Sequence, residues 1–211
     1  MSRTRTRPTR EETCSRLFQA AAAQFERRGI GDTSIDAIAA EAGFSRGAFY
    51  SNFSGKDDLI IAMLEDHAER SLRHHRALLA QHAEPADLIA ALQSAERRDD
   101  PLGRSPLLHI ELILYIARAE QRRPELAERL RARRALTAEI IAAIGLGRPD
   151  VDPHWAGALL VALDDGFRLH RLIDPATTPA DSFYAAVTRL QLLTTHEKAP
   201  PDCAGGADGT S

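Results

Sequence analysis

The chain has 211 residues, a net charge of −3, and 44% hydrophobic and 27% charged side chains. This composition is ordinary for a water-soluble globular protein and excludes a polycation that coats nucleic acid, although a local basic patch is compatible with it. No apolar run approaches the ~18 residues that a membrane span needs, and Cys14 and Cys203 match no metal or disulfide spacing. We expect a cytoplasmic protein with no membrane contact, no cofactor and no metal ion.

The N-terminus is strongly basic, with arginine at positions 3, 5, 7 and 10, and no apolar segment follows it as in a secretory signal. We expect residues 1–8 to form a disordered basic arm. Such an arm is either a solvated tail or a source of additional contacts with DNA phosphates.

The first helix is predicted to begin at a capping box that Thr9 forms with Glu12. Apolar residues then recur at helical spacing, and Gly29 is expected to end the helix.

Two short helices are predicted next. Thr33 with Asp36 reads as a second capping box, and Gly43 stops that helix. Ser45 can cap a third helix that reaches about Asn52.

The rest of the chain predicts long helices. Ser54 with Asp57 is expected to cap a fourth helix, which meets no breaker before Pro85. Prolines at first helical positions and apolar periodicity predict helices at about 85–98, 105–120, 124–145, 153–173 and 179–195. With no strand-like alternation, we expect an all-α fold of about nine helices and a disordered tail over 196–211.

The segment "TSIDAIAAEAGFSRGAFYSNF" predicts a helix, a four-residue turn and a second helix. Ala39 is small where the second helix must come close, Gly43 can adopt the left-handed conformation that the turn needs, and Phe44 fills the corner. This pattern is typical of a helix-turn-helix, whose second helix enters the major groove of DNA.

The third helix is predicted to have two faces. Phe49 and Phe53 lie four residues apart and should bury, whereas Arg46 and Tyr50 share another face on which Gly47 lets the backbone approach a groove. Arg46 is suited to a guanine edge, and Tyr50, Thr33, Ser45 and Lys56 are suited to phosphates. The candidate DNA-contacting residues are Thr33, Ser34, Ser45, Arg46, Gly47, Tyr50, Asn52 and Lys56. The alternative is a polar helix of a bundle with Tyr50 half-buried.

The stretch "GIGDTSIDAIAAEAGFSRGAFYSNFSGKDDLI" resembles the DNA-binding signature of the tetracycline-repressor (TetR/AcrR) family of bacterial transcriptional regulators. The resemblance implies a three-helix DNA-binding domain over residues 9–54 and a helical ligand-binding and dimerisation domain over 55–195. Asn52 departs from the pattern, because many relatives carry histidine there.

The last two predicted helices are candidates for a dimer interface, since two helices from each subunit can form a four-helix bundle. The candidate residues are Trp155, Leu159, Ala162, Leu169, Phe183, Val187 and Leu190. The alternative is that these faces pack only inside one subunit.

The segments "HIELILYIARAE" and "VALDDGFRLHRL" are candidates for the walls of an effector pocket, because they are mostly apolar with a few polar groups. The candidate residues are His109, Leu112, Ile113, Ile116, Asp165 and Phe167. An inward-facing aspartate would need a partner such as Arg168 or Arg171. The alternative is ordinary core with aspartates on the surface.

Four histidines, at positions 67, 74, 75 and 82, fall within about one third of the circumference of the fourth helix. The gap of seven residues between the first two argues against a shared metal ion. We expect a stripe that faces solvent or lines a pocket.

These features together predict a ligand-responsive transcriptional regulator, most often a repressor in the family that the chain resembles. It would bind a twofold-symmetric double-stranded DNA operator as a homodimer and be released by a small-molecule effector. The alternatives are a small helical enzyme with His109 or His170 as general base, and a helical adaptor that binds protein.

Overall fold

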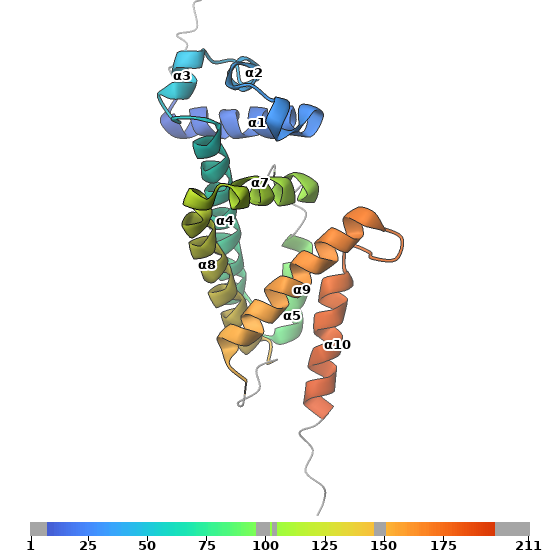
Figure 1. Ribbon diagram of the computed structural model, residues 1–211. Coiled ribbons are helices and arrows are strands. Elements are labelled where there is room, and N and C mark those ends of the chain that lie inside the picture. The colour runs from blue at the N-terminus through green and yellow to red at the C-terminus, as the bar shows by residue number, and fades with distance from the viewer. Residues whose placement is uncertain (1–7, 96–101, 103–104, 146–150, 197–211) are drawn as a thin grey trace, which may run out of the picture.

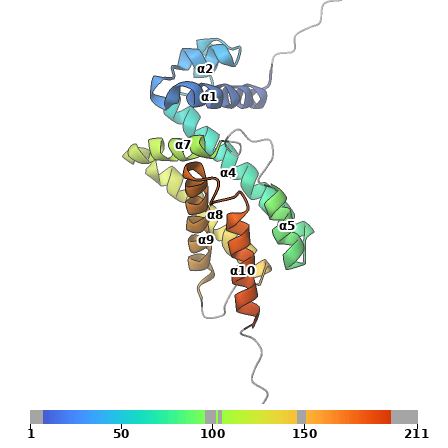
Figure 2. The same ribbon diagram turned by 90° about the vertical axis from the view of Figure 1, so that its right-hand side faces the viewer.

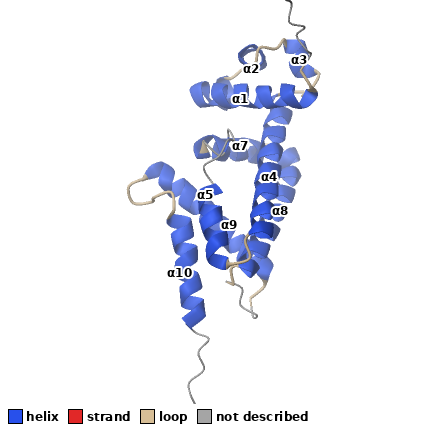
Figure 3. Cartoon of the chain, turned by 180° about the vertical axis from the view of Figure 1, so that it is seen from behind, coloured by secondary structure: helices blue, strands red, loops and turns tan. Residues whose placement is uncertain are grey.

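A computed structural model of the protein describes residues 8–95, 102, 105–145 and 151–196. Within these ranges the chain forms nine α-helices, one short 3-10 helix and no strand (Figures 1 and 3). The all-α prediction is therefore confirmed. Residues 1–7 and 197–211, which hold most of the expected arm and tail, lie outside the described residues.

Three helices form the front of the molecule, with α1 (Arg10–Asp32) beneath α2 (Ile35–Glu41) and α3 (Arg46–Tyr50) (Figure 1). The predicted capping box is present, because the Thr9 hydroxyl accepts from the Glu12 amide at 3.1 Å and the Thr9 amide donates to Glu12 at 2.8 Å. Gly29 interrupts the helical geometry of α1 with φ 79°, as predicted, and a further turn follows to Asp32.

Two predicted caps are wrong. The residue that caps α2 is Ser34, whose hydroxyl accepts from the Ala37 amide at 3.1 Å, and not Thr33. The fourth helix, α4 (Lys56–Gln81), follows Gly55 without a side-chain cap, because the Ser54 hydroxyl instead binds the Asp58 carboxylate.

The rear of the molecule is built from α4 and the remaining helices. These are α5 (Pro85–Ala95), α7 (Pro106–Arg118), the 3-10 helix η1 (Glu120–Arg122), α8 (Arg123–Ala143), α9 (Pro153–Ile173) and α10 (Ser182–His196). Helix α8 lies beside α4, and α9 and α10 lie side by side (Figures 1 and 2). No described helix is both long and apolar enough to cross a membrane.

Two hydrophobic cores hold these helices together. The front core joins α1, α2, α3 and the first turns of α4 to the inner face of α7, with Phe25, Phe49, Leu59, Leu112 and Ile116 fully buried. The far core joins the end of α4 to α5, α8 and α10; its buried members are Leu78, Leu88, Ile89, Leu92, Ile144, Tyr184 and Val187.

Helix α7, η1 and α8 also bind the first turns of α4 through polar side chains. Tyr115 donates to Asp57 over 3.0 Å, Arg122 donates to Asp58 over 2.5 Å, and Arg129 pairs with Glu65. The pKa of Asp58 is lowered, mainly by the Ser54 hydrogen bond and also by Arg122. Because Asp58 lies in the first turn of α4, the helix dipole also favours its charge.

Helices α8 and α9 come closest at Gly157. A Cβ atom there would lie 2.4 Å from the Arg134 carbonyl oxygen and 3.1 Å from the Ala138 amide nitrogen. Gly166, the other glycine of α9, has nothing within 4 Å of such a position. The glycine that the packing of α9 requires is therefore Gly157.

We expect Gly157→Ala to lower the free energy of unfolding by about 1–3 kcal/mol, because the added methyl group meets backbone that cannot rotate away. Gly166→Ala, on the same helix, should leave stability unchanged or raise it by about 1 kcal/mol through helix propensity. Urea unfolding followed by circular dichroism measures both variants, and equal stabilities would contradict the close contact between α8 and α9.

Candidate DNA-binding surface and ligand cavity

The turn between α2 and α3 is held from below by α1. Arg16 donates to the Ala42 carbonyl oxygen at 2.6 Å, and its guanidinium lies 4.5 Å from the centre of the Phe44 ring. Gly43 has φ 71°, the left-handed conformation that the sequence predicts for it. The role of Arg16 is not visible in the sequence, because it depends on a contact across 26 residues.

Helix α3 sits on the front core through the two phenylalanines that the sequence predicts. Phe49 and Phe53 are buried, their ring centres are 5.7 Å apart, and Phe53 lies 5.9 Å from Phe18. This anchoring sets which face of α3 points outward.

Arg46 and Tyr50 lie on that outward face. The Arg46 side chain is 62% exposed; it pairs with Asp36 at 2.9 Å and donates to the Tyr50 hydroxyl at 3.4 Å. These neighbours, Tyr50 first and then Asp36, raise the pKa of Arg46. The pairs are exposed and therefore weak, so Arg46 can exchange them for a base or a phosphate at little cost.

Ser34, Ser45 and Gly47 are also exposed, and both serines cap a helix through their hydroxyls. A Cβ atom at Gly47 would meet only the Ser45 hydroxyl, at 3.8 Å, so the backbone of α3 is open there. The structure thus brings Ser45, Arg46, Gly47 and Tyr50 together on one short exposed helix.

Three predicted DNA contacts are engaged inside the protein instead. Thr33 is 2% exposed and its hydroxyl donates to the Gly29 carbonyl oxygen. The Lys56 ammonium donates to the carbonyl oxygens of Ile30, Gly31 and Thr33 at 2.5, 3.3 and 3.0 Å, which uses all three of its donors. Asn52 donates to the Ala48 carbonyl oxygen and accepts from the Cys14 thiol. We therefore omit Thr33, Lys56 and Asn52 from the proposed interface.

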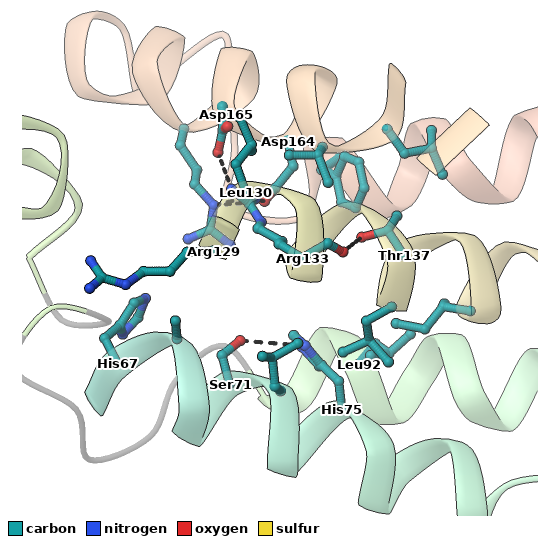
Figure 4. A pocket seen from close by; sticks show the side chains of 18 of the residues that line it. His67, Ser71, His75, Leu92, Arg129, Leu130, Arg133, Thr137, Asp164 and Asp165 are labelled. Atoms are coloured by element: carbon teal, nitrogen blue, oxygen red, sulfur yellow. Dashed lines mark hydrogen bonds and ion pairs between the residues drawn. The ribbon is translucent and has the colours of Figure 1, made fainter. Parts of the chain in front are cut away.

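A cavity of about 800 Å³ lies behind this domain, enclosed by α4, α5, α7, α8, α9 and α10 (Figure 4). Of the predicted pocket residues, His109, Ile113 and Asp165 line it. Leu112 and Ile116 lie instead in the front core, where both are fully buried. Phe167 is not among the lining residues; its ring meets the ring of Phe183 edge to face, with the ring centres 6.5 Å apart.

An ion-pair cluster joins α8 to α9 at one wall of the cavity (Figure 4). Arg133 binds Asp164 at 2.5 Å and Asp165 at 2.7 Å, and Arg168 binds Asp164 at 3.1 Å. The expected partnership of Arg168 with an inward aspartate is confirmed. Arg133 could not be chosen from sequence, because it lies on a different helix.

Three histidines of the stripe line the cavity: His67, His74 and His75. The sequence left open whether the stripe faces solvent or lines a pocket, and for these three the structure shows the second. Burial is the main cause that lowers the pKa of His75 to about 4; His74, Arg133 and Arg168 lower it further, and Asp164 opposes them. The imidazole is therefore neutral at pH 7. Among the described residues, no group of three His, Cys, Asp or Glu side chains is placed to hold a metal ion.

The outer face of α9 is apolar and exposed. Trp155 is 60% and Leu159 44% exposed, and Ala162, Leu163 and Leu169 continue the same exposed surface.

Two of the candidate dimer residues on α10 pack within their own subunit, and we omit them from the proposed interface. Val187 is 4% exposed in the far core and Phe183 lines the cavity, so both serve their own subunit. The side chain of Leu190 lies outside the described residues.

The depressed pKa of His75 predicts a specific loss of stability in acid. The unfolded imidazole, with a pKa of 6.5, binds a proton below that pH, whereas the folded one does so only near 4. Stability is therefore lost as the pH falls from 6.5 towards 4, by about 2 kcal/mol at pH 5. Urea unfolding at pH 7.5 and 5 should show a smaller drop for His75→Phe than for the wild type; equal drops would contradict a buried neutral imidazole.

The sequence matches two family descriptions over most of its length. Residues 17–63 match "Bacterial regulatory proteins, tetR family", and residues 80–191 match "Tetracyclin repressor-like, C-terminal domain".

Two relatives illustrate the range of sequence similarity. The HTH-type transcriptional repressor Rv3405c of Mycobacterium tuberculosis is 34% identical over 184 residues, which cover 87% of this chain and 86% of that protein. The HTH-type transcriptional regulator TtgR of Pseudomonas putida is 34% identical over 114 residues, or 52% of this chain, and the match spans only 47% of TtgR.

Solved structures share the fold. A transcriptional regulator from Pseudomonas aeruginosa PAO1 superimposes with a TM-score of 0.70 at 25% identity, covering 93% of this chain and 96% of that one. SmeT, the repressor of a multidrug efflux pump of Stenotrophomonas maltophilia, superimposes with a TM-score of 0.64 at 19% identity, over 87% of this chain and 91% of SmeT.

The family match argues against the enzyme that His109 or His170 would have served, since the family is one of regulatory proteins. The chain belongs to the tetR family of bacterial regulatory proteins and is a DNA-binding transcriptional regulator.

Proposed function

We propose that the protein is a cytoplasmic, homodimeric repressor that binds a twofold-symmetric operator and leaves it when a small molecule fills the cavity. Residues 9–54 read DNA, and residues 55–195 bind the effector and form the dimer. The observation that carries the proposal is the exposed Arg46–Tyr50 face of α3, held outward by the buried Phe49 and Phe53.

Arg46 is the residue proposed to read a base. Its guanidinium can donate two parallel hydrogen bonds to a guanine edge in the major groove. Ser45 and Tyr50 beside it, and Ser34 at the start of α2, are placed to donate to phosphates, which position the protein without reading sequence.

The outer face of α9 is the proposed dimer interface. Trp155, Leu159 and Leu169 form a run of exposed apolar residues along one helix, and such a surface favours burial against a partner. A single α3 makes few contacts with DNA, and a twofold dimer doubles them. Helix α10 supports α9 from inside the subunit and contributes its inner residues to the far core.

Helix α7 is the proposed link between the cavity and DNA. His109 and Ile113 face the cavity, while Tyr115 on the same helix binds Asp57 in the first turn of α4. A ligand that binds better to one position of α7 would shift α4, and with it α3. A solved structure of SmeT is a complex with triclosan, which supports a ligand role for a cavity in this fold.

We expect Arg46→Ala to weaken binding to the selected operator by about 5- to 150-fold and to relax one base preference. The operator would come from selection of random duplexes by the purified protein, and affinities from fluorescence anisotropy at several salt concentrations. Arg73→Ala is the matched control, since Arg73 is an equally exposed arginine on α4 that pairs with Glu69. Unchanged affinity of the Arg46 variant would overturn the assignment.

We expect Leu159→Glu to raise the dimer dissociation constant at least about tenfold, because it places a charge in an apolar interface. Leu107→Glu is the control, since Leu107 is also exposed but lies on α7. Sedimentation velocity measures the change. A monomeric wild type, or an equal effect of both variants, would contradict the α9 interface.

A further inference from the structure

Each charged side chain among the described residues that line the cavity has an ion-pair partner within the protein, and the one donor among them that is buried without a hydrogen-bond partner, Nη1 of Arg129, belongs to a residue at the end of the cavity away from His75 (Figure 4). Each of its four arginines forms an ion pair with a carboxylate of the protein: Arg70 with Asp66, Arg129 with Glu65, Arg133 with Asp164 and Asp165, and Arg168 with Asp164. The two aspartates that line the cavity are both held by Arg133. A charged group placed at the His75 end of the cavity would therefore have to break an existing pair or lie there without a counter-charge, and both are costly away from water.

His75 offers a different kind of contact. Its Nδ1 atom lies 3.4 Å from the Ser71 hydroxyl, and Nε2 has no hydrogen-bond partner among the described residues. Since the ring is mostly buried and lines the cavity, Nε2 can be satisfied only by what enters that space. The low pKa of His75 keeps the ring neutral, so it suits an uncharged hydrogen-bonding group.

One side of the cavity beside His75 is apolar. Leu92 lies on the same side of the cavity as His75, whereas His67 and Arg129 lie at the opposite end (Figure 4). Further apolar lining comes from α5, α8, α9 and α10 through Ile89, Ile140, Leu160 and Val187. A volume of about 800 Å³ accommodates a molecule of several fused rings.

We propose that the effector is an uncharged, mainly apolar molecule with one hydroxyl group, and that this hydroxyl binds Nε2 of His75. The Ser71 hydroxyl can accept from Nδ1–H, which leaves Nε2 as an acceptor, so the hydroxyl of the effector is proposed to donate to Nε2. The inference rests on the proposed ligand-binding role of the cavity and adds the chemical class of the ligand.

Four probes on one skeleton test the proposal: 1-hydroxypyrene, 1-methoxypyrene, 1-pyrenecarboxylate and 1-pyrenylmethyl-trimethylammonium. Their binding to the full chain at pH 7 is measured by the anisotropy of pyrene fluorescence. We expect 1-hydroxypyrene to bind about tenfold tighter than its methyl ether, which cannot donate, and the two charged probes to bind more weakly than the ether. Equal binding of a charged probe and 1-hydroxypyrene, or no binding of any probe, would overturn the proposal.

His75→Phe keeps a ring in the wall but removes the hydrogen bond. This substitution should remove the preference for 1-hydroxypyrene over 1-methoxypyrene. The affinity for 1-methoxypyrene should stay unchanged, which would also show that the cavity is intact. His82→Phe is the matched control, because His82 directly follows the same helix and lies outside the cavity lining. If the His75 variant does not fold, the comparison of the four probes on the wild type still decides.

DNA binding is measured separately on the same preparation, so that the two proposals can fail independently. A chain that binds a selected duplex but does not distinguish the probes overturns the effector class and leaves the proposed function standing. A chain that prefers 1-hydroxypyrene but binds no duplex supports the effector class and contradicts the proposed function.

Discussion

The burial of the first turns of α4 is the constraint on which the rest of the structure depends. Leu59 and Ile60 are fully buried, and the core around them contains α1, α2 and α3 on one side and α7 on the other. Separating the three front helices from α7 would expose this apolar surface to water, at roughly 25 cal/mol per Å². Lys56 adds to the constraint, because the first residue of α4 holds the carbonyl end of α1. The DNA-binding helices and α7 therefore form one packed unit, although they belong to different functional parts.

The cavity lies where α4 passes between its two cores. The helix leaves the front core at Leu64 and joins the far core at Leu78, and the residues between them, including His67 and His75, face the open space. The lining side chains of this segment are both polar, as at Ser71 and His75, and apolar, as at Leu72. A bound molecule would touch groups from both cores at once, which is the physical basis for coupling it to α7.

Much of the fold could be predicted from the sequence, because capping residues, glycine turns and helical periodicity act over a few residues. The two faces of α3 are such a case, since Phe49 and Arg46 are sorted by spacing alone. What could not be predicted is which helices pack against each other. Periodicity places His109 and Leu112 on one short segment, but only the packed structure shows that the first lines the cavity and the second is buried in the front core. Arg133 could not be identified for the same reason, since its aspartates lie 31 and 32 residues away.

The separation of the two cores also bears on how such a protein can diverge. The cavity shares Leu64 and Leu102 with the buried front core, and its other lining residues belong to the rear helices. Substitutions at positions such as His75, Leu92 or Leu160 can therefore change the molecule that is recognised while the packing beneath α3 stays the same. The architecture allows the effector specificity to evolve independently of the DNA sequence that α3 recognises.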